Sequence, residues 1–281
     1  MKIGIGLDSY RRWGEKRYQK LKEHGFSCVD FNMMNTTHFP YSDSIKESEN
    51  KLIAERKLAE ESNVEIYQVH GPWQWPPNDY SEELINAKLE NVKRSLWATA
   101  MLGCKNWVIH PVMPCGINDK GTENQKITLD VNLDFMRKAL KTAKEYDITI
   151  CLENMPMKDF SLATPYDILD FINLINDDHF KICLDTGHVA TFPNLSAAKA
   201  VRDLGNKIQA FHIHDSFPDR DLHLLPYFGT TDWADFSRAL KEINYTGGLC
   251  LETAPPHALP DDIYEELCIN LFKIVKTIAN N

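Results

Sequence analysis

The sequence predicts an α/β protein that folds as a single (β/α)8 TIM barrel. Short, nearly continuous apolar runs alternate with longer segments of helical periodicity, which is typical of a parallel sheet covered by helices. The alternation occurs eight times, and this number favours closure into a barrel over an open doubly wound sheet. The 281 residues suit one such barrel, and no low-complexity or Pro/Gly-rich linker divides them, so we expect one domain over 1–281.

Each expected strand is a short apolar run that ends at polar or turn-forming residues. The runs are KIGIGL (2–7), CVDFN (28–32), EIYQVH (65–70), NWVIH (106–110), ITICLE (148–153), KICLD (181–185), IQAFHIH (208–214) and GLCLE (248–252). Gly247 and Gly248 suit the turn into the last strand. The first strand leads into GIGLDS, which lacks the third glycine of a dinucleotide-binding fingerprint, so we do not expect a Rossmann site.

Each expected helix is a segment of helical periodicity that follows one of these strands. The segments are 13–24, 44–61, 81–102, 127–146, 166–176, 195–204, 233–243 and 261–279. Thr164 followed by Pro165 suits the N-cap and the first position of the fifth helix. Strands and helices therefore form eight successive pairs.

Composition and charge narrow the class of protein. Hydrophobic residues make up 43% and charged residues 25%, as in ordinary soluble globular proteins, and no apolar run approaches bilayer-spanning length. The formal net charge of -9 opposes a general affinity for phosphate backbones, so nucleic acid is the less expected partner. The N-terminus lacks the features of a secretory signal, and we expect a cytoplasmic protein with no membrane partner.

The cysteines agree with a reducing compartment. There are seven of them, an odd number, and no two form a CxxC pair. Cys151, Cys183 and Cys250 lie inside apolar runs, which indicates small core residues rather than disulfides or metal ligands.

Potential metal ligands stand at the ends of six consecutive expected strands. They are His70, His110, Glu153, Asp185, His212 and Glu252. A single aspartate or histidine after a strand is more simply explained as a turn former or a cap. In a barrel, however, the carboxyl ends of all strands meet at one face, where the active sites of this fold lie. Six such endings in succession therefore predict a shared site.

The residue types suggest which ligands share a cation. Three carboxylates and one imidazole form an oxygen-rich set suited to Mn²⁺, Mg²⁺ or Co²⁺: Glu153, Asp185, His212 and Glu252. A second group, in which imidazole and carboxylate would also suit Zn²⁺, comprises His70, His110, Asp221 and His223. The histidines of this second group could equally hydrogen-bond a polyhydroxylated substrate.

Other side chains near these motifs are candidates for contacts with a sugar. Trp73 lies just beyond a strand end, where its face could pack against the C–H groups of a sugar ring, and Trp75 is a second candidate. Trp107 lies inside the fourth strand and is expected to pack in the core or outward. Arg220 precedes Asp221 and could bind a hydroxyl or a phosphate, although a solvated surface arginine is the alternative.

An ordered set of motifs resembles the xylose-isomerase-like TIM-barrel superfamily. The motifs are HGPW (70–73), IHP (109–111), LENMP (152–156), LDTGH (184–188), HIHDS (212–216), DLHLLP (221–226), TTDW (230–233) and LET (251–253). The superfamily unites sugar and sugar-phosphate isomerases and epimerases with AP endonucleases of the endonuclease IV type. Its members are often dimers or tetramers, so the resemblance also implies a homodimer or homotetramer.

The two branches of this superfamily imply different uses of the same residues. By resemblance to the ketose 3-epimerases, Glu153, Asp185, His212 and Glu252 match single-metal ligands, both glutamates match acid/base residues, and His188 matches a substrate contact. By resemblance to the endonucleases, the residues that match the ligands of three zinc ions are His70, His110, Glu153, Asp185, His188, His212, Asp221, His223 and Glu252. The segment GIGLDSYRRW lacks the histidine-bearing first-strand motif of DNA-cleaving members. Tyr227 replaces the first glycine of the PGxG element that many presumed sugar isomerases carry.

The expected activity is a divalent-metal-dependent sugar or sugar-phosphate isomerisation or epimerisation. The cation would polarise a ketose carbonyl and stabilise an enediolate, while Glu153 and Glu252 remove and return a proton. The alternative is a zinc phosphodiesterase that acts on abasic DNA. A non-catalytic sugar-sensing role ranks last, because both glutamates are present.

Overall fold

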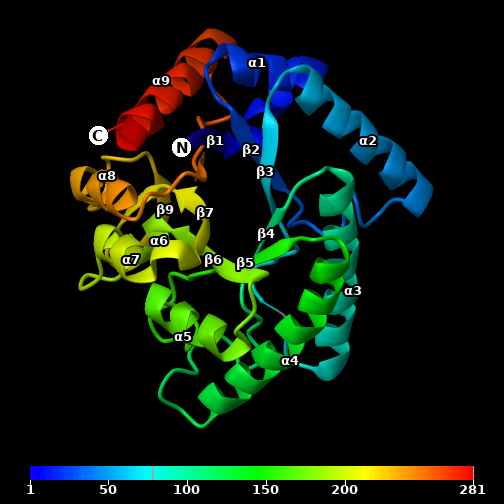
Figure 1. The fold of residues 1–281 in the computed structure, drawn as a ribbon, viewed down its shortest axis with the longest axis vertical. Helices are drawn as coiled ribbons and strands as arrows, with labels where there is room; N and C mark the ends of the chain where they lie inside the picture. Colours follow the sequence, from blue (N-terminus) through cyan, green and yellow to red (C-terminus); the bar gives the residue numbers. More distant parts are fainter. Residues whose placement is uncertain (78, 281) are drawn as a thin grey trace.

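Eight parallel strands close into a barrel in this structure, a computed structural model that describes residues 1–77 and 79–280. Their bounds are β1 (Lys2–Gly6), β2 (Cys28–Asn32), β3 (Glu65–His70), β4 (Asn106–Ile109), β5 (Thr149–Glu153), β6 (Phe180–Asp185), β7 (Ile208–Ile213) and β10 (Gly248–Leu251). The order around the barrel is β1-β10-β7-β6-β5-β4-β3-β2, so that β1 closes the ring by pairing with both β2 and β10 (Figure 1). The predicted (β/α)8 barrel is confirmed.

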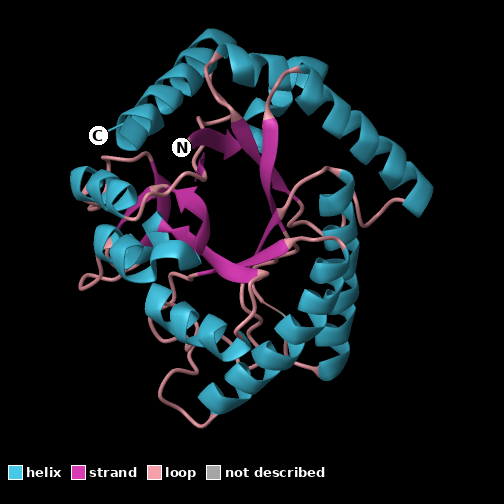
Figure 2. Ribbon diagram, in the orientation of Figure 1, coloured by secondary structure: helices cyan, strands magenta, loops and turns pink. Residues whose placement is uncertain are grey.

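The helices surround the strands on the outside of the barrel (Figure 2). Their bounds are α1 (Arg17–Glu23), α2 (Ile45–Glu61), α3 (Glu82–Met101), α4 (Asn124–Glu145), α5 (Pro165–Ile175), α7 (Ala197–Leu204), α8 (Trp233–Glu242) and α9 (Asp261–Asn280). Thr164 caps α5, since its hydroxyl accepts a hydrogen bond from the backbone of Asp167 and Pro165 begins the helix as predicted. The helix expected over 13–24 is divided, because its first residues belong to a 3₁₀ segment, η1 (Leu7–Lys16), which Gly14 kinks with a positive φ of 54°, and α1 begins only at Arg17.

Two short elements at the carboxyl ends of the strands were not expected. Helix α6 (Thr186–Ala190) follows β6 directly, and an antiparallel hairpin of β8 (Asp215–Phe217) and β9 (Arg220–Leu224) follows β7. Figure 1 shows β9 beside β7 and α6. These strands are too short and too polar to give a recognisable alternation in sequence. The hairpin gives Asp221 and His223, two of the predicted ligands, a defined place in β9.

The core explains the cysteines. Cys28 and Cys250 flank Gly4 inside the barrel, where a side chain on residue 4 would overlap both sulfur atoms. All seven cysteines are free, as expected for core residues, and six are buried.

Trp107 is fully buried and donates a hydrogen bond to the hydroxyl of Ser95 (2.8 Å), so its expected packing in the core is confirmed. None of the helices described is long and apolar enough to cross a membrane.

Candidate functional site

The oxygen-rich set of four predicted ligands converges at the carboxyl ends of neighbouring strands. Glu153 ends β5, Asp185 ends β6, His212 lies near the end of β7, and Glu252 follows β10. One ligand atom from each lies within 4.8 Å of all the others. The Nδ1 atom of His212 is 2.9 Å from Glu153 Oε1, 3.2 Å from Glu252 Oε2 and 3.9 Å from Asp185 Oδ2.

The electrostatics of these four residues fit a divalent cation. Glu153 and Asp185 are completely buried, and burial of several carboxylates is costly without a positive charge among them. Burial raises the pKa of Glu252 above its usual range, and the nearby Glu153 adds to the rise against the opposing effect of His212. The Oε2 atom of Glu252 is buried and, although His212 Nδ1 lies 3.2 Å away, it accepts no hydrogen bond in the described structure. A cation among these four side chains would satisfy that oxygen.

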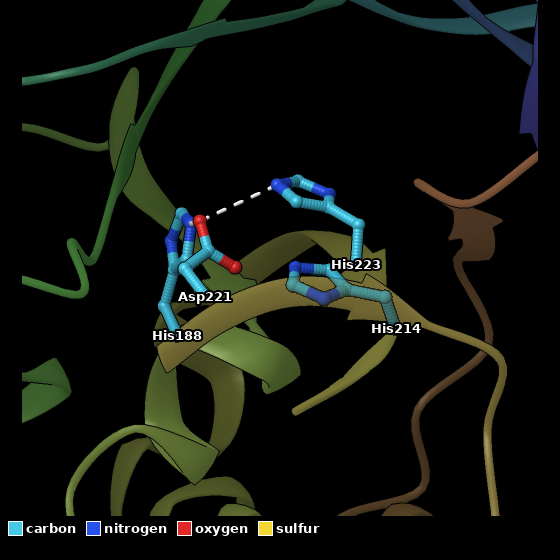
Figure 3. Close-up of side chains that lie close together, drawn as sticks. All are labelled: His188, His214, Asp221 and His223. Atoms are coloured by element: carbon cyan, nitrogen blue, oxygen red, sulfur yellow. Dashed lines mark ion pairs between the residues drawn. The ribbon is translucent and has the colours of Figure 1, made fainter. Parts of the chain in front are cut away.

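A second cluster lies next to the first and contains His188, His214, Asp221 and His223. Asp221 Oδ2 is 3.4 Å from His188 Nε2 and 3.3 Å from His223 Nε2, and the latter pair is marked in Figure 3. The rings of His214 and His223 stack with their centroids 4.2 Å apart. Burial by itself would lower the pKa of His188, but Asp185 and Asp221 outweigh it and raise this pKa to about 10. The second cluster could therefore also hold a cation, in exchange for protons.

The remaining two predicted ligands lie beside Glu153. His110 Nε2 is 3.0 Å and His70 Nε2 is 3.4 Å from Glu153 Oε2, and these two nitrogens are 3.2 Å apart. Burial lowers the pKa of His110 to about 4, which leaves the ring neutral and able to bind a metal. His70, His110, Asp221 and His223, which were expected as one group, thus form two groups: His70 and His110 lie beside Glu153, whereas Asp221 and His223 lie with His188 and His214.

A cavity of about 430 Å³ opens beside these clusters. Its lining residues are Met34, Trp73, Trp75, His110, Met155, Pro156, Met157, His188, Asp221, His223 and Glu252. The Trp73 ring is half-buried, 4.4 Å from the ring of His110, whereas Trp75 is mostly exposed. Arg220 does not line the cavity and is exposed on β9, where its carbonyl oxygen accepts a hydrogen bond from the Ser216 hydroxyl.

Two residues at the site were missed by sequence reasoning. His214 donates a hydrogen bond from Nε2 to Oδ2 of Asp185 (2.9 Å), and its alternation with His212 in the motif HIH was the available signal. Asp30 of β2 is 2.8 Å from His212 Nε2, and its only signal was a carboxylate inside an otherwise apolar strand. Gly187 is required beside them, because a side chain there would overlap the His214 ring.

Comparison with known proteins finds relatives in sequence and in fold. A D-psicose 3-epimerase of Enterocloster bolteae is 25% identical over 265 residues, which cover 90% of this chain and 82% of that protein. A "Probable endonuclease 4" of Metamycoplasma arthritidis is 31% identical over 134 residues, covering 43% of this chain and 45% of that protein. The crystal structure of the IOLI protein with a bound zinc atom has the same fold, with a TM-score of 0.75 at 16% identity over 99% of this chain and 98% of that chain.

The family is shown by a match over most of the sequence. A family model described as xylose isomerase-like TIM barrel matches residues 18–268, a span that contains all the predicted ligands. This match confirms the resemblance carried by the motifs at the strand ends. The chain therefore belongs to the xylose isomerase-like TIM barrel family.

Proposed function

We propose that this protein, acting as one domain, is a divalent-metal-dependent isomerase or epimerase of a sugar or sugar phosphate. The observation that carries the proposal is the convergence of three carboxylates and one imidazole within 4.8 Å beside a cavity of about 430 Å³. The relative named as a D-psicose 3-epimerase, which covers 90% of this chain, supports a ketose as the substrate.

The residues that would hold the cation are Glu153, Asp185, His212 and Glu252. Their oxygen-rich chemistry suits Mn²⁺, Co²⁺ or Mg²⁺, and Zn²⁺ is the alternative. When bound, such a cation polarises a carbonyl and makes the neighbouring carbon more acidic.

The two glutamates are suited to moving the proton. Glu252 lines the cavity, and its burial raises its pKa, so it carries a proton more readily than an exposed glutamate does. Glu153 is held in its charged form. Burial opposes this charge, but His212 and His110 outweigh burial and lower the pKa of Glu153 well below the usual range. We therefore assign the removal of the substrate proton to Glu153, which is held as a carboxylate, and the return of a proton to Glu252, whose raised pKa lets it carry one.

The rest of the cavity would orient the sugar. Trp73 offers an aromatic face at the cavity wall, and His188 offers a ring nitrogen for a substrate hydroxyl. Arg220 remains a predicted contact for a substrate phosphate. Its side chain is exposed on β9 and is not among the residues that line the cavity. The cytoplasmic location and a homodimer or homotetramer also remain predictions.

Proton exchange with solvent tests the proposal directly. The protein is stripped of metal, reloaded with Mn²⁺ or Co²⁺, and incubated with a panel of ketoses in deuterated water. We expect deuterium at the carbon next to the carbonyl of at least one ketose, and no deuterium with Glu252→Gln. Glu65→Gln is the matched control, because this exposed glutamate lies at the opposite end of β3 from His70. Unchanged exchange in Glu252→Gln would remove Glu252 from the reaction.

A zinc phosphodiesterase is the second candidate. Its support is the continuous arrangement of all nine side chains that match the endonuclease ligands, together with the partial match to a "Probable endonuclease 4". The net charge of -9 weighs against it, because a DNA-binding surface is usually basic. Elemental analysis decides between the two: about one Mn²⁺ or Co²⁺ per chain supports the epimerase, whereas two or three tightly held Zn²⁺ would make abasic DNA the substrate to test.

A further inference from the structure

His212 is the only nitrogen ligand among the four residues proposed to hold the cation, and both of its ring nitrogens are engaged. Its Nδ1 atom faces the three carboxylates, at 2.9 Å from Glu153 and 3.2 Å from Glu252. Its Nε2 atom lies 2.8 Å from Oδ2 of Asp30. Asp30 belongs to β2, which is separated from β7 by β1 and β10 around the barrel, so this contact reaches across the barrel interior.

The contact with Asp30 bears on which ring nitrogen of His212 carries a proton. A neutral imidazole carries one proton, and the nitrogen that binds a metal must be the one without it. An ionised carboxylate only accepts hydrogen bonds. On the Nδ1 side Glu153 would be engaged by the cation, so Asp30 is the acceptor left for the ring proton and favours the form with the proton on Nε2 and the lone pair on Nδ1. We infer that Asp30 is a positioning residue that holds the Nε2 proton of His212 and thereby presents Nδ1 to the divalent cation.

Asp30 is itself held in place for this role. Its side chain is buried, with 8% of the residue exposed. Gln68 of β3 donates a hydrogen bond from Nε2 to the same Oδ2 atom at 2.8 Å and a second to the carbonyl oxygen of Phe211 at 3.3 Å. Gln68 thus ties Asp30 to the backbone next to His212. Within the described part of the chain, Asp30 forms an ion pair with His212 and with no lysine or arginine.

The position of Asp30 also distinguishes it from a ligand. It lies on the Nε2 side of the ring, away from the three carboxylates, and is not one of the residues whose ligand atoms meet within 4.8 Å. Carboxylates that accept a hydrogen bond from the second nitrogen of a metal-binding histidine orient the ring and make it a better donor, and losing them weakens metal binding about 10- to 100-fold.

Metal binding by the stripped, full-length protein tests the inference without any substrate. Titration calorimetry with Mn²⁺ gives the affinity, and the visible spectrum of the Co²⁺ form reports the ligands around the ion. Asp30→Ala should weaken Mn²⁺ binding about 10- to 100-fold and change the Co²⁺ spectrum. Asp30→Asn should bind within about 10-fold of the natural protein, because the amide oxygen can still accept from both His212 and Gln68. Asp30→Asn also preserves the test if Asp30→Ala does not fold.

Asp8→Ala is the matched control. Asp8 lines the same small cavity as Asp30 but pairs with Arg11 and Asn32, so its loss should change Mn²⁺ affinity less than about twofold. The inference is overturned if Asp30→Ala binds Mn²⁺ like the natural protein, or if Asp8→Ala weakens binding as much, which would indicate a general effect of charge. The inference rests on the proposed metal site, and Asp185→Ala separates the two. Failure of the natural protein to bind Mn²⁺, or binding that Asp185→Ala leaves intact, would refute the site itself and the inference with it.

Discussion

Asp215 allows a quantitative test of how the second cluster is held. Its carboxylate is fully buried and accepts four hydrogen bonds. Oδ1 accepts from the backbone of Ser216 (3.0 Å) and Thr231 (3.1 Å), and Oδ2 accepts from the backbone of Tyr227 (3.1 Å) and the indole of Trp233 (2.8 Å). These bonds join the β8–β9 hairpin to the segment that leads into α8.

The number of bonds sets the size of the effect. Asp215→Ala leaves three backbone N–H groups and one indole N–H without an acceptor, and at about 1 kcal/mol per bond it should lower the free energy of unfolding by about 4 kcal/mol. Asp215→Asn keeps one accepting oxygen and turns an amide N–H₂ toward two donors, so about 2 kcal/mol is expected. Trp233→Phe removes one bond, worth about 1 kcal/mol, and shortens a buried ring, so about 2–3 kcal/mol is expected in total, still less than for Asp215→Ala.

Equilibrium urea denaturation followed by far-ultraviolet circular dichroism measures this series, and the method does not depend on the tryptophan that is changed. Asp178→Ala is the control, because this carboxylate is exposed and lies 3.9 Å from Lys181, and its replacement should cost less than about 0.5 kcal/mol. The reasoning is refuted if Asp215→Ala unfolds within 1 kcal/mol of the natural protein, or if Trp233→Phe costs as much as Asp215→Ala.

Two further predictions concern the histidines of the second cluster. Gly187→Ala places a methyl group on the His214 ring and should cost about 1–3 kcal/mol of unfolding free energy; Gly6→Ala, whose nearest neighbour would be 3.9 Å away, should cost less, and equal losses would contradict the overlap. The pH dependence of the metal-free protein is the second. Because the folded pKa of His188 is raised to about 10, its contribution to stability is complete below about pH 6.5 and is lost as the pH rises toward 10. The melting temperature should therefore fall less over pH 7 to 10 in His188→Gln than in the natural protein, and parallel curves would contradict the shift.

The position of a residue could be predicted from the sequence where that position depends only on the residue's own strand. The apolar runs predicted the strands, and parallel strands in a barrel necessarily deliver their carboxyl ends to one face. Glu153, Asp185, His212 and Glu252 could therefore be predicted to meet, and the structure brings them within 4.8 Å.

The contacts that could not be predicted depend on how the barrel closes. Asp30 and His212 are 182 residues apart in the chain and meet only because strands tilt and stagger as the sheet closes, which no local pattern encodes. The grouping of His70 with His110, and of Asp221 with His223 and His188, depends in the same way on which strand ends are adjacent and on the course of the β8–β9 hairpin.

The β8–β9 hairpin carries part of the second cluster, whereas the carboxyl ends of the barrel strands carry the proposed ligands of the first cation. Asp221 and His223 reach the site on this single short excursion of the chain, whereas the four proposed ligands of the first cation belong to the barrel itself. Shortening the excursion would delete half of the second cluster and leave the barrel's own ligands in place. Insertion or deletion at this one turn would therefore change the residues of the second cluster without changing the strands that form the core.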